Sequence, residues 1–140
     1  MPSFELFNWI GGGGITWFAP VCPARGKDMQ HQMELGQRII EKHNIDFMCG
    51  SGFGEREVFN LMPLIYDRTS AERRQEVAAC YRELTTEFGK AGYGIYRTSI
   101  GYMDQVAENH GLTNLQVNRR IKQALDPNGI LAPGKSGIRL

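Results

Sequence analysis

The sequence is poor in cysteine, in net charge and in long apolar runs, and each absence excludes a class of protein. Its three cysteines, Cys22, Cys49 and Cys80, are an odd number and widely spaced, without a CxxC pair or a histidine at metal-ligand spacing. We therefore expect neither a disulfide framework nor a metal site. Sixteen Lys and Arg residues against 15 Asp and Glu residues give a net charge of +1. This balance does not favour nucleic acid or an anionic membrane surface as a partner.

Targeting segments are also missing. The start, MPSFELFNWIGGGG, has no basic region and no apolar stretch of signal-peptide type, and no run approaches the roughly 18 apolar residues of a membrane span. We expect a cytoplasmic protein in a reducing compartment. The segment FELFNWI at 4–10 is unusually apolar for a terminus. We interpret residues 1–14 as the remnant of a preceding segment with a glycine loop, and the chain as a fragment of something larger.

The rest of the sequence has the length and apolar content of one globular domain, with 140 residues of which 41% are hydrophobic. Apolar periodicity and turn residues predict the order strand, helix, strand, strand, helix, strand, followed by two shorter helices and a loop tail. This order predicts an α+β fold with a ferredoxin-like antiparallel sheet. The predicted strands are 15–21, 45–49, 58–66 and 93–97, and the predicted helices are 28–42, 69–90, 99–109 and 114–125.

Three local features of this plan can be checked against a structure. Pro63 lies inside a strand that should be central, which calls for a bulge or a different pairing. Thr69 and Glu72 have the spacing of a helix capping box. The apolar positions of the last helix, which should face inward, are Val117, Ile121, Ala124 and Leu125. We assign 15–97 to one unit and the C-terminal helices and tail, 98–140, to another.

Few residues point to chemistry by their type alone. Tyr96 and Arg97 place a phenol hydroxyl beside a guanidinium, a pair suited to an oxyanion or phenolate, although a surface salt bridge is the commoner use of such an arginine. Trp17 and Phe18 are adjacent on a strand, so one of them faces away from the core and can line a cleft. Lys135, flanked by turn residues, suits either a closing loop or a phosphate contact.

Four motifs in order carry a resemblance that covers nearly the whole chain. They are WFAPV at 17–21, GIYR at 94–97, GYMDQVAENHG at 101–111 and DPNGILAPGKSG at 126–137. Together they resemble the C-terminal part of the 4-cresol dehydrogenase and vanillyl-alcohol oxidase family of flavoproteins. The resemblance implies oxidation of para-substituted phenols, in which FAD accepts a hydride from the benzylic carbon and a quinone methide forms. The unit 15–97 would be much of the cap, or substrate, domain.

The resemblance also implies roles for particular residues. Tyr96 and Arg97 match the pair that holds the substrate phenolate, and Trp17 and Phe18 match a wall of the active site. The tail would return to the FAD domain and contact the cofactor through Asn128, Pro133, Gly134 and Lys135.

Two departures from the family pattern concern the flavin and the catalytic groups. No His or Tyr precedes His31, so we expect this segment to hold FAD without a covalent bond. A stretch that is rich in histidine in relatives reads GEREVFN here, at 54–60.

The resemblance implies that an N-terminal FAD-binding domain lies outside this sequence, and we expect that domain to be the main partner. A homo-oligomer and a cytochrome electron acceptor are further partners that it allows. Two alternatives stay open: a stand-alone ferredoxin-like module that binds an aromatic anion, and a truncated, inactive gene product.

Overall fold

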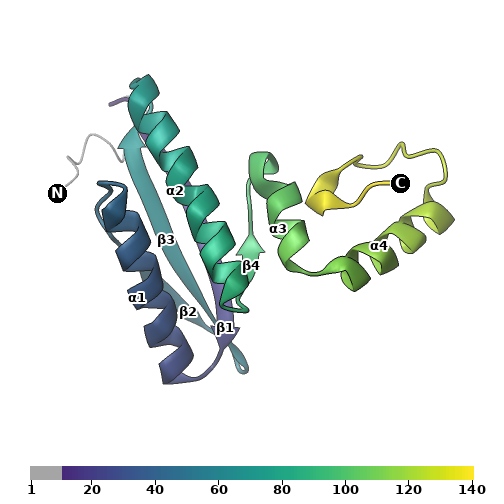
Figure 1. The fold of residues 1–140 in the computed structure, drawn as a ribbon, viewed down its shortest axis with the longest axis horizontal. Coiled ribbons are helices and arrows are strands. Elements are labelled where there is room, and N and C mark those ends of the chain that lie inside the picture. Colours follow the sequence, from purple (N-terminus) through teal and green to yellow (C-terminus); the bar gives the residue numbers. More distant parts are fainter. Residues whose placement is uncertain (1–10) are drawn as a thin grey trace. The chain divides into compact units, whose positions relative to one another are not determined.

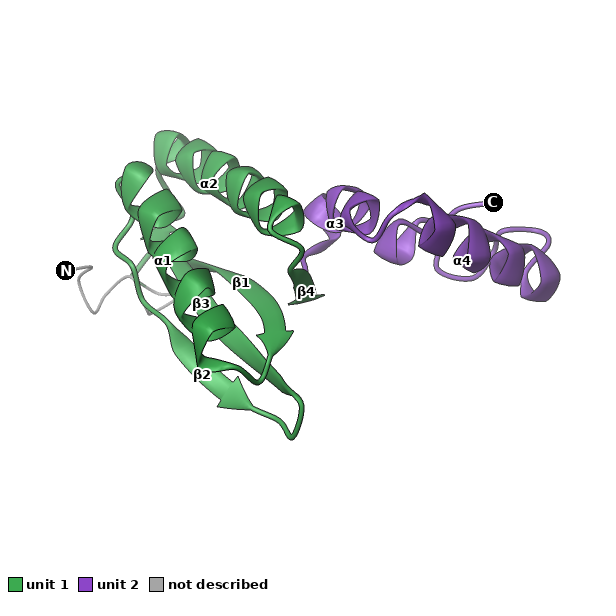
Figure 2. Cartoon of the chain, turned by 60° about the horizontal axis from the view of Figure 1, so that its bottom comes forward, with its two compact units in different colours: residues 1–97 green, residues 98–140 purple. Residues whose placement is uncertain are grey.

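The chain divides into two compact units, residues 1–97 and 98–140 (Figure 2), and the computed structural model describes residues 11–140. The predicted segment 1–14 therefore falls mostly outside the described residues. In residues 11–97 the elements follow the predicted order (Figure 1): β1 (Gly13–Pro23), α1 (Gly26–Lys42), β2 (Gly50–Phe53), β3 (Glu57–Asp67), α2 (Ala71–Lys90) and β4 (Gly94–Arg97).

The four strands form one antiparallel sheet in the order β2-β3-β1-β4. This is the ferredoxin-like order, in which the first and third strands are central and the second and fourth are at the edges. The predicted α+β fold with its antiparallel sheet is confirmed.

Both helices of this unit cover the same face of the sheet. Phe18 of β1 makes edge-to-face contacts with Tyr81 and Phe88 of α2, at ring-centroid distances of 5.5 and 4.9 Å. Met62, which pairs with Phe18 across the ladder, lies so close to Gly36 of α1 that a Cβ there would overlap its thioether. The core is thus the layer between the sheet and the two helices. We call the other face of the sheet the helix-free face.

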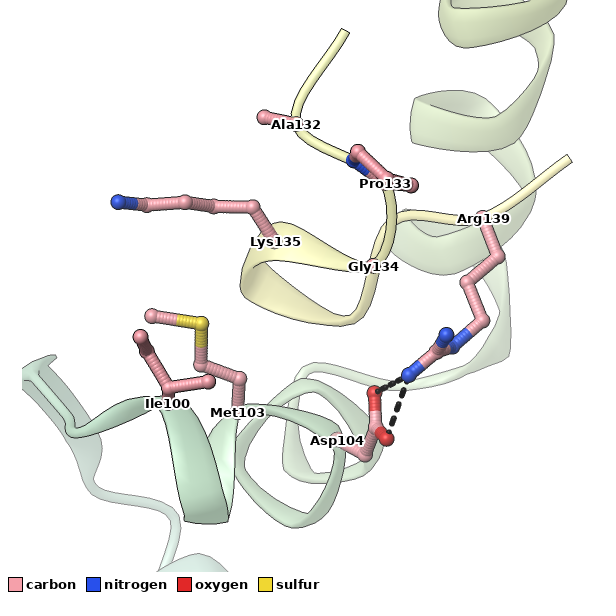
Figure 3. Close-up of a pocket in the computed structure, with 8 residues that line it drawn as sticks. All are labelled: Ile100, Met103, Asp104, Ala132, Pro133, Gly134, Lys135 and Arg139. Carbon is pink, nitrogen blue, oxygen red and sulfur yellow. Dashed lines mark hydrogen bonds and ion pairs between the residues drawn. The ribbon is translucent and has the colours of Figure 1, made fainter. Parts of the chain in front are cut away.

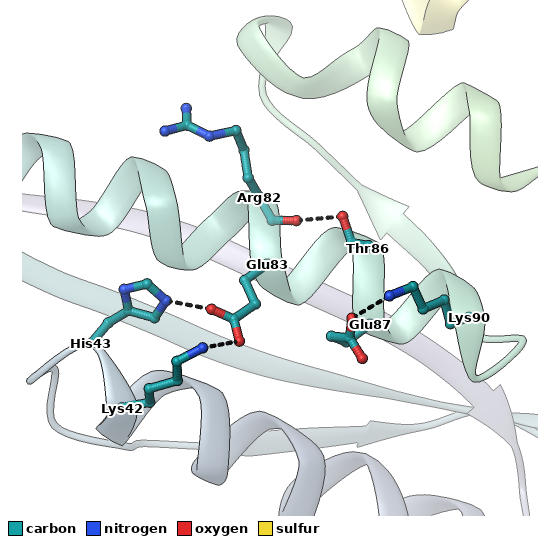
Figure 4. Close-up of polar contacts among 7 residues, drawn as sticks. All are labelled: Lys42, His43, Arg82, Glu83, Thr86, Glu87 and Lys90. Carbon is teal, nitrogen blue, oxygen red and sulfur yellow. Dashed lines mark hydrogen bonds and ion pairs between the residues drawn. The ribbon is translucent and has the colours of Figure 1, made fainter.

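Polar contacts tie the two helices to each other at the edge of this layer (Figure 4). Glu83 of α2 accepts from Lys42 Nζ at 2.7 Å, and its second oxygen lies 2.8 Å from His43 Nε2 at the end of α1. The hydrogen bond to Lys42, followed by that to His43, lowers the pKa of Glu83. The carboxylate therefore stays charged and holds α1 against α2.

The predicted strand 45–49 is wrong, because α1 ends at Lys42 and residues 45–49 form the loop that follows its closing turn. Asn44 has a φ of 54°, and the N–H groups of Asn44 and Ile45 bond back to Glu41 and Ile40. This is a Schellman motif, whose apolar residue after the helix packs inward, and Ile45 is 3% exposed. Residue 45 is therefore apolar because it closes a helix.

The second strand forms instead on Gly50–Phe53, directly after the predicted range. It pairs with the start of β3, from Gly50 opposite Leu61 to Phe53 opposite Val58. A buried chain of hydrogen bonds fixes it: Ser51 Oγ donates to Asn60, and Asn60 Nδ2 donates to Gln32 of α1.

Pro63 fits the central strand without a bulge, because the β1–β3 register stays the same from Gly13 opposite Asp67 to Pro23 opposite Glu57. The reason is the short β2, whose pairing with β3 ends at Leu61. Within residues 11–140, one side of β3 has no strand partner at Pro63, and a proline is tolerated at such an edge.

Helix α2 begins one residue later than the predicted capping box. Ser70 is the N-cap, and its hydroxyl accepts from the N–H of Arg73 at 3.2 Å. Thr69 instead donates its hydroxyl to Asp67 in the preceding turn.

In residues 98–140 the structure confirms two further α-helices, α3 (Met103–Asn109) and α4 (Leu112–Leu125), with the short 3₁₀ turns η2 (Ile100–Tyr102) and η3 (Lys135–Gly137). No helix within residues 11–140 is long and apolar enough to cross a membrane.

The expectation that the apolar residues of α4 face inward is wrong. Val117, Ile121 and Leu125 are 50%, 52% and 77% exposed. The less exposed side of the helix is the one with Leu115, Asn118 and Lys122. Lys122 bonds there to Asp126 and to the Leu131 carbonyl of the tail, so the helix contacts the tail through a side other than the predicted one.

Candidate active site

Tyr96 and Arg97 end the edge strand β4, where the register against β1 shifts. Ala19 pairs with Arg97, but the next residue, Pro20, pairs with Ile95, so Tyr96 is an extra residue on β4. Opposite residues of an antiparallel pair point to the same face. Arg97 therefore lies on the helix-free face with Ala19, while Pro20 and Ile95 lie on the helix side.

This bulge allows two consecutive residues to share one face. The Tyr96 ring stacks on Phe59 with a centroid distance of 5.7 Å and an interplanar angle of 21°. Phe59 pairs with Val21, which lies two residues from Ala19 on β1 and therefore on the same face of the sheet. Phe59 thus belongs to the helix-free face. Adjacent strand residues normally point to opposite faces, and bulges of this kind re-aim side chains near active sites.

Arg97 is exposed, and within residues 11–140 its guanidinium makes no hydrogen bond or ion pair. The salt bridge that is the common use of such an arginine is therefore not formed by the described carboxylates. Its donors are available to an external anion.

The two aromatic residues predicted to line the site are on opposite faces of β1. Trp17 is 49% exposed and, two residues from Ala19, lies on the helix-free face. Phe18 is fully buried under α2. Of this pair, Trp17 is the one whose ring can meet a molecule on the helix-free face, and Phe18 anchors the strand behind it.

The middle of the helix-free face is apolar apart from Tyr96 and Arg97. On β3 the alternate residues of this face are Phe59, Leu61, Pro63 and Ile65, and carboxylates appear at the two ends of the strand, at Glu57 and Asp67. One cation and one hydroxyl at the border of an aromatic surface suit a flat, singly charged anion.

The second unit presents a separate pocket of about 280 Å³ (Figure 3). It is lined by Ile100, Met103, Asp104, Ala132, Pro133, Gly134, Lys135 and Arg139. Arg139 donates two hydrogen bonds to Asp104, at 3.0 and 2.8 Å. The ammonium of Lys135 extends away from the ribbon, and within residues 11–140 it makes no ion pair.

The loop before this pocket is held by Asp126, whose two oxygens accept from the N–H groups of Ile130 and Leu131, each at 2.9 Å. The hydrogen bond from Lys122 is the main reason why the pKa of Asp126 is lowered. The turn that follows contains Gly134 with a φ of 76°, a left-handed conformation that favours glycine. Asn128 is exposed in the same loop.

Comparison with known proteins identifies the family of this chain. Residues 23–136 match the family described as FAD linked oxidases, C-terminal domain. The chain belongs to this family. The predicted resemblance is thereby confirmed, and FAD is the cofactor of the FAD linked oxidases.

Two curated relatives are similar in sequence to this chain. The 4-cresol dehydrogenase [hydroxylating] flavoprotein subunit of Pseudomonas putida is 40% identical over 140 residues, which are 100% of this chain and 27% of the relative. The 1'-carboxy-chondrochloren decarboxylase of Chondromyces crocatus is 27% identical over 127 residues, 90% of this chain and 23% of the relative. This chain thus spans about a quarter of the length of these relatives.

Solved structures of similar proteins agree with the fold. A crystal structure of p-cresol methylhydroxylase with substrate bound has a TM-score of 0.89 and 40% identity, and the match covers 95% of this chain and 26% of that one. A 4-ethylphenol oxidase from Gulosibacter chungangensis, in complex with isoeugenol, has a TM-score of 0.87 and 39% identity, with the same coverage.

The tail has donors of the kind that FAD requires. The cofactor carries a pyrophosphate and ring carbonyls, and an uncommitted ammonium beside a turn that only glycine adopts easily is suited to either. Of the four residues predicted to contact FAD, the pocket contains Pro133, Gly134 and Lys135, and Asn128 lies outside its lining. Sequence reasoning missed Met103, Asp104 and Arg139 of the same pocket, since contacts between α3 and the tail leave no local signal.

Proposed function

We propose that this chain is the C-terminal, substrate-binding part of an FAD-dependent oxidoreductase that oxidises para-substituted phenols at the benzylic carbon. The observation that carries the proposal is the bulge in β4, which brings the hydroxyl of Tyr96 and the uncommitted guanidinium of Arg97 to one aromatic face. The names of the relatives support a phenol as substrate, because three of them act on a cresol or an ethylphenol.

Two donors are what a phenolate requires. With a pKa near ~10, a phenol costs ~4 kcal/mol to hold ionised at pH 7. A hydrogen bond to a charged group contributes ~1.5–3 kcal/mol, and a neutral one ~0.5–1.5 kcal/mol. Arg97 and Tyr96 together therefore supply an energy of the required size. The negative charge on the ring oxygen favours departure of the benzylic hydride.

FAD, when bound, accepts that hydride. In this part of the enzyme Asn128, Pro133, Gly134 and Lys135 would contact it, with Lys135 as the cationic donor. Trp17 would form the wall against the substrate ring, with Phe18 behind it. We infer non-covalent binding by this segment, since no His or Tyr precedes His31.

The partner that completes the site is an FAD-binding domain, because the chain spans about a quarter of its relatives, which are 27% and 23% covered. We propose that the 140 residues alone are inactive. A cytochrome acceptor, a homo-oligomer and a cytoplasmic location belong to the same proposal. The runner-up is a stand-alone module that binds aromatic anions on the helix-free face.

The test uses the complete flavoprotein, mixed anaerobically with a para-alkylphenol or with its methyl ether. The phenol should bleach the visible absorbance of FAD, whereas the ether, which cannot ionise, should leave the band almost unchanged. Equal reduction by both compounds would refute a phenolate mechanism. Tight binding of the phenol without any bleaching would favour the binding module.

A further inference from the structure

Tyr96 is a residue whose backbone does little to orient its side chain. It is the extra residue of the bulge, so it has no partner on β1, and β4 is an edge strand. Its side chain is 64% exposed. An exposed tyrosine on such a backbone samples several rotamers, and a hydroxyl that must meet a substrate oxygen requires one.

The ring of Phe59 opposes this freedom. It reaches Tyr96 across β1, from the strand on the other side, and stacks on it at 5.7 Å and 21°. Within residues 11–140 this is the only ring contact that Tyr96 makes. The offset, nearly parallel arrangement is one that aromatic pairs prefer.

Phe59 is itself held by a glycine. It pairs with Gly52 of β2, and a Cβ on Gly52 would overlap three atoms of the Phe59 ring. The ring therefore lies directly over the glycine, in space that every other residue would fill. A glycine in a strand weakens it, and close approach of a ring is a physical reason to keep one there.

We propose that Phe59, seated on Gly52, is a positioning residue that holds the ring of Tyr96 so that its hydroxyl lies beside the Arg97 guanidinium. The inference rests on the proposed function, because orienting the Tyr96 hydroxyl matters only if that hydroxyl binds the substrate oxygen. It also assigns a role to the stretch at 54–60 that lacks the histidines of relatives, since Phe59 lies within it.

The first measurement follows the tyrosine ring and needs no turnover. The complete flavoprotein is labelled with 3-fluorotyrosine, and the ¹⁹F signal of Tyr96 is assigned by its loss in Tyr96→Phe. Phe59→Leu should move and narrow that signal, because the ring current and the restraint of the stack are lost. Phe59→Tyr should keep the signal close to its original place. The matched control is Phe53→Leu, on the same hairpin, where the ring is 70% exposed.

The second measurement is the affinity for 4-nitrophenol, a phenol that ionises near neutral pH, determined by calorimetry with 4-nitroanisole as the non-ionisable control. Phe59→Leu and Gly52→Ala should each weaken binding about two- to tenfold, the range that an aromatic pair supports. The loss from Phe59→Leu should nearly vanish in a Tyr96→Phe background, because the hydroxyl being positioned is gone.

Three results would overturn the inference, and they are distinguishable. An unmoved ¹⁹F signal in Phe59→Leu shows that Phe59 does not position the ring. Binding by the wild type, with additive losses from Phe59→Leu and Tyr96→Phe, refutes the positioning role and leaves the proposed function standing. A wild type that binds 4-nitrophenol no better than 4-nitroanisole refutes the proposed function, and the role of Phe59 with it.

Discussion

Replacing Arg97 by alanine removes a cation that no described side chain engages. Within residues 11–140 its guanidinium has no ion-pair partner, so the variant leaves no carboxylate of this part of the chain unpaired. The effect on catalysis therefore reports on substrate. A lost charged hydrogen bond of ~1.5–3 kcal/mol corresponds to a decrease of about 10- to 150-fold in kcat/KM for a phenol.

The pH dependence is the more specific part of this prediction. In the proposed site Arg97 would lower the pKa of the bound phenol, so in Arg97→Ala that pKa should rise by about one to two units. At saturating phenol, flavin reduction by the variant should be slow at pH 7 and should recover as the pH approaches ~10, where the phenol ionises unaided. Stopped-flow measurement of flavin reduction across this range gives the two profiles.

Two further variants separate the contribution of the Arg97 guanidinium from that of the Tyr96 hydroxyl. Arg97→Lys should recover part of the rate, because lysine offers a point charge in place of a planar fork. Tyr96→Phe should lose less, about two- to tenfold, since it removes a neutral donor. The reasoning is refuted if the loss in Arg97→Ala is the same at all pH values and binding of the methyl ether is weakened as much as that of the phenol. Arg97 would then be structural.

The remaining predictions concern this chain by itself. The purified 140 residues should be colourless, and stoichiometric flavin in the visible spectrum would contradict this. The same chain should self-associate through exposed apolar side chains such as Val117, Ile121 and Leu125. A monomer that binds no hydrophobic dye would contradict that expectation. Ser70→Ala should destabilise the fold by about 1 kcal/mol in urea unfolding, and Ser70→Asp should not; equal stability of the two variants argues against the cap. Glu83 has a lowered pKa, so its stabilisation is complete above the ordinary carboxyl pKa and is lost as the pH falls through the folded value. The difference in melting temperature between wild type and Glu83→Gln should therefore shrink in acid. A difference that stays constant down to pH 2 would count against stabilisation by the ionised Glu83 carboxylate.

Much of the fold could be predicted because apolar periodicity and packing agree in the long elements. Strand 15–21 and helix 28–42 differ from β1 (Gly13–Pro23) and α1 (Gly26–Lys42) by two residues or fewer at each end. The failures occur where an apolar residue or a glycine serves another purpose. Ile45 closes a helix and Gly52 accommodates a ring, and neither purpose is visible in a pattern of hydrophobicity.

The candidate residues Tyr96 and Arg97 were named from their chemistry and from the family resemblance, and their role stays a prediction. Their shared face could not be predicted, because an alternating strand would have placed them on opposite faces. The bulge that unites them depends on the register with β1, which is a property of the pairing. Phe59 was missed for the same reason, because its contact with Tyr96 joins two strands that are not neighbours in the sheet.

The bulge in β4 also bears on which changes in length this segment tolerates. Side chains on a strand alternate with a period of two, so the face of a residue depends on how many residues separate it from the last fixed pair. Removing one residue between Gly94, which pairs with Val21, and Arg97 would restore a regular ladder. It would also make Tyr96 and Arg97 diverge, although both side chains would remain in the sequence. Insertions and deletions here should therefore be rarer among active relatives than substitutions, and a homologue with GIYR shortened by one residue should have lost the proposed phenolate site.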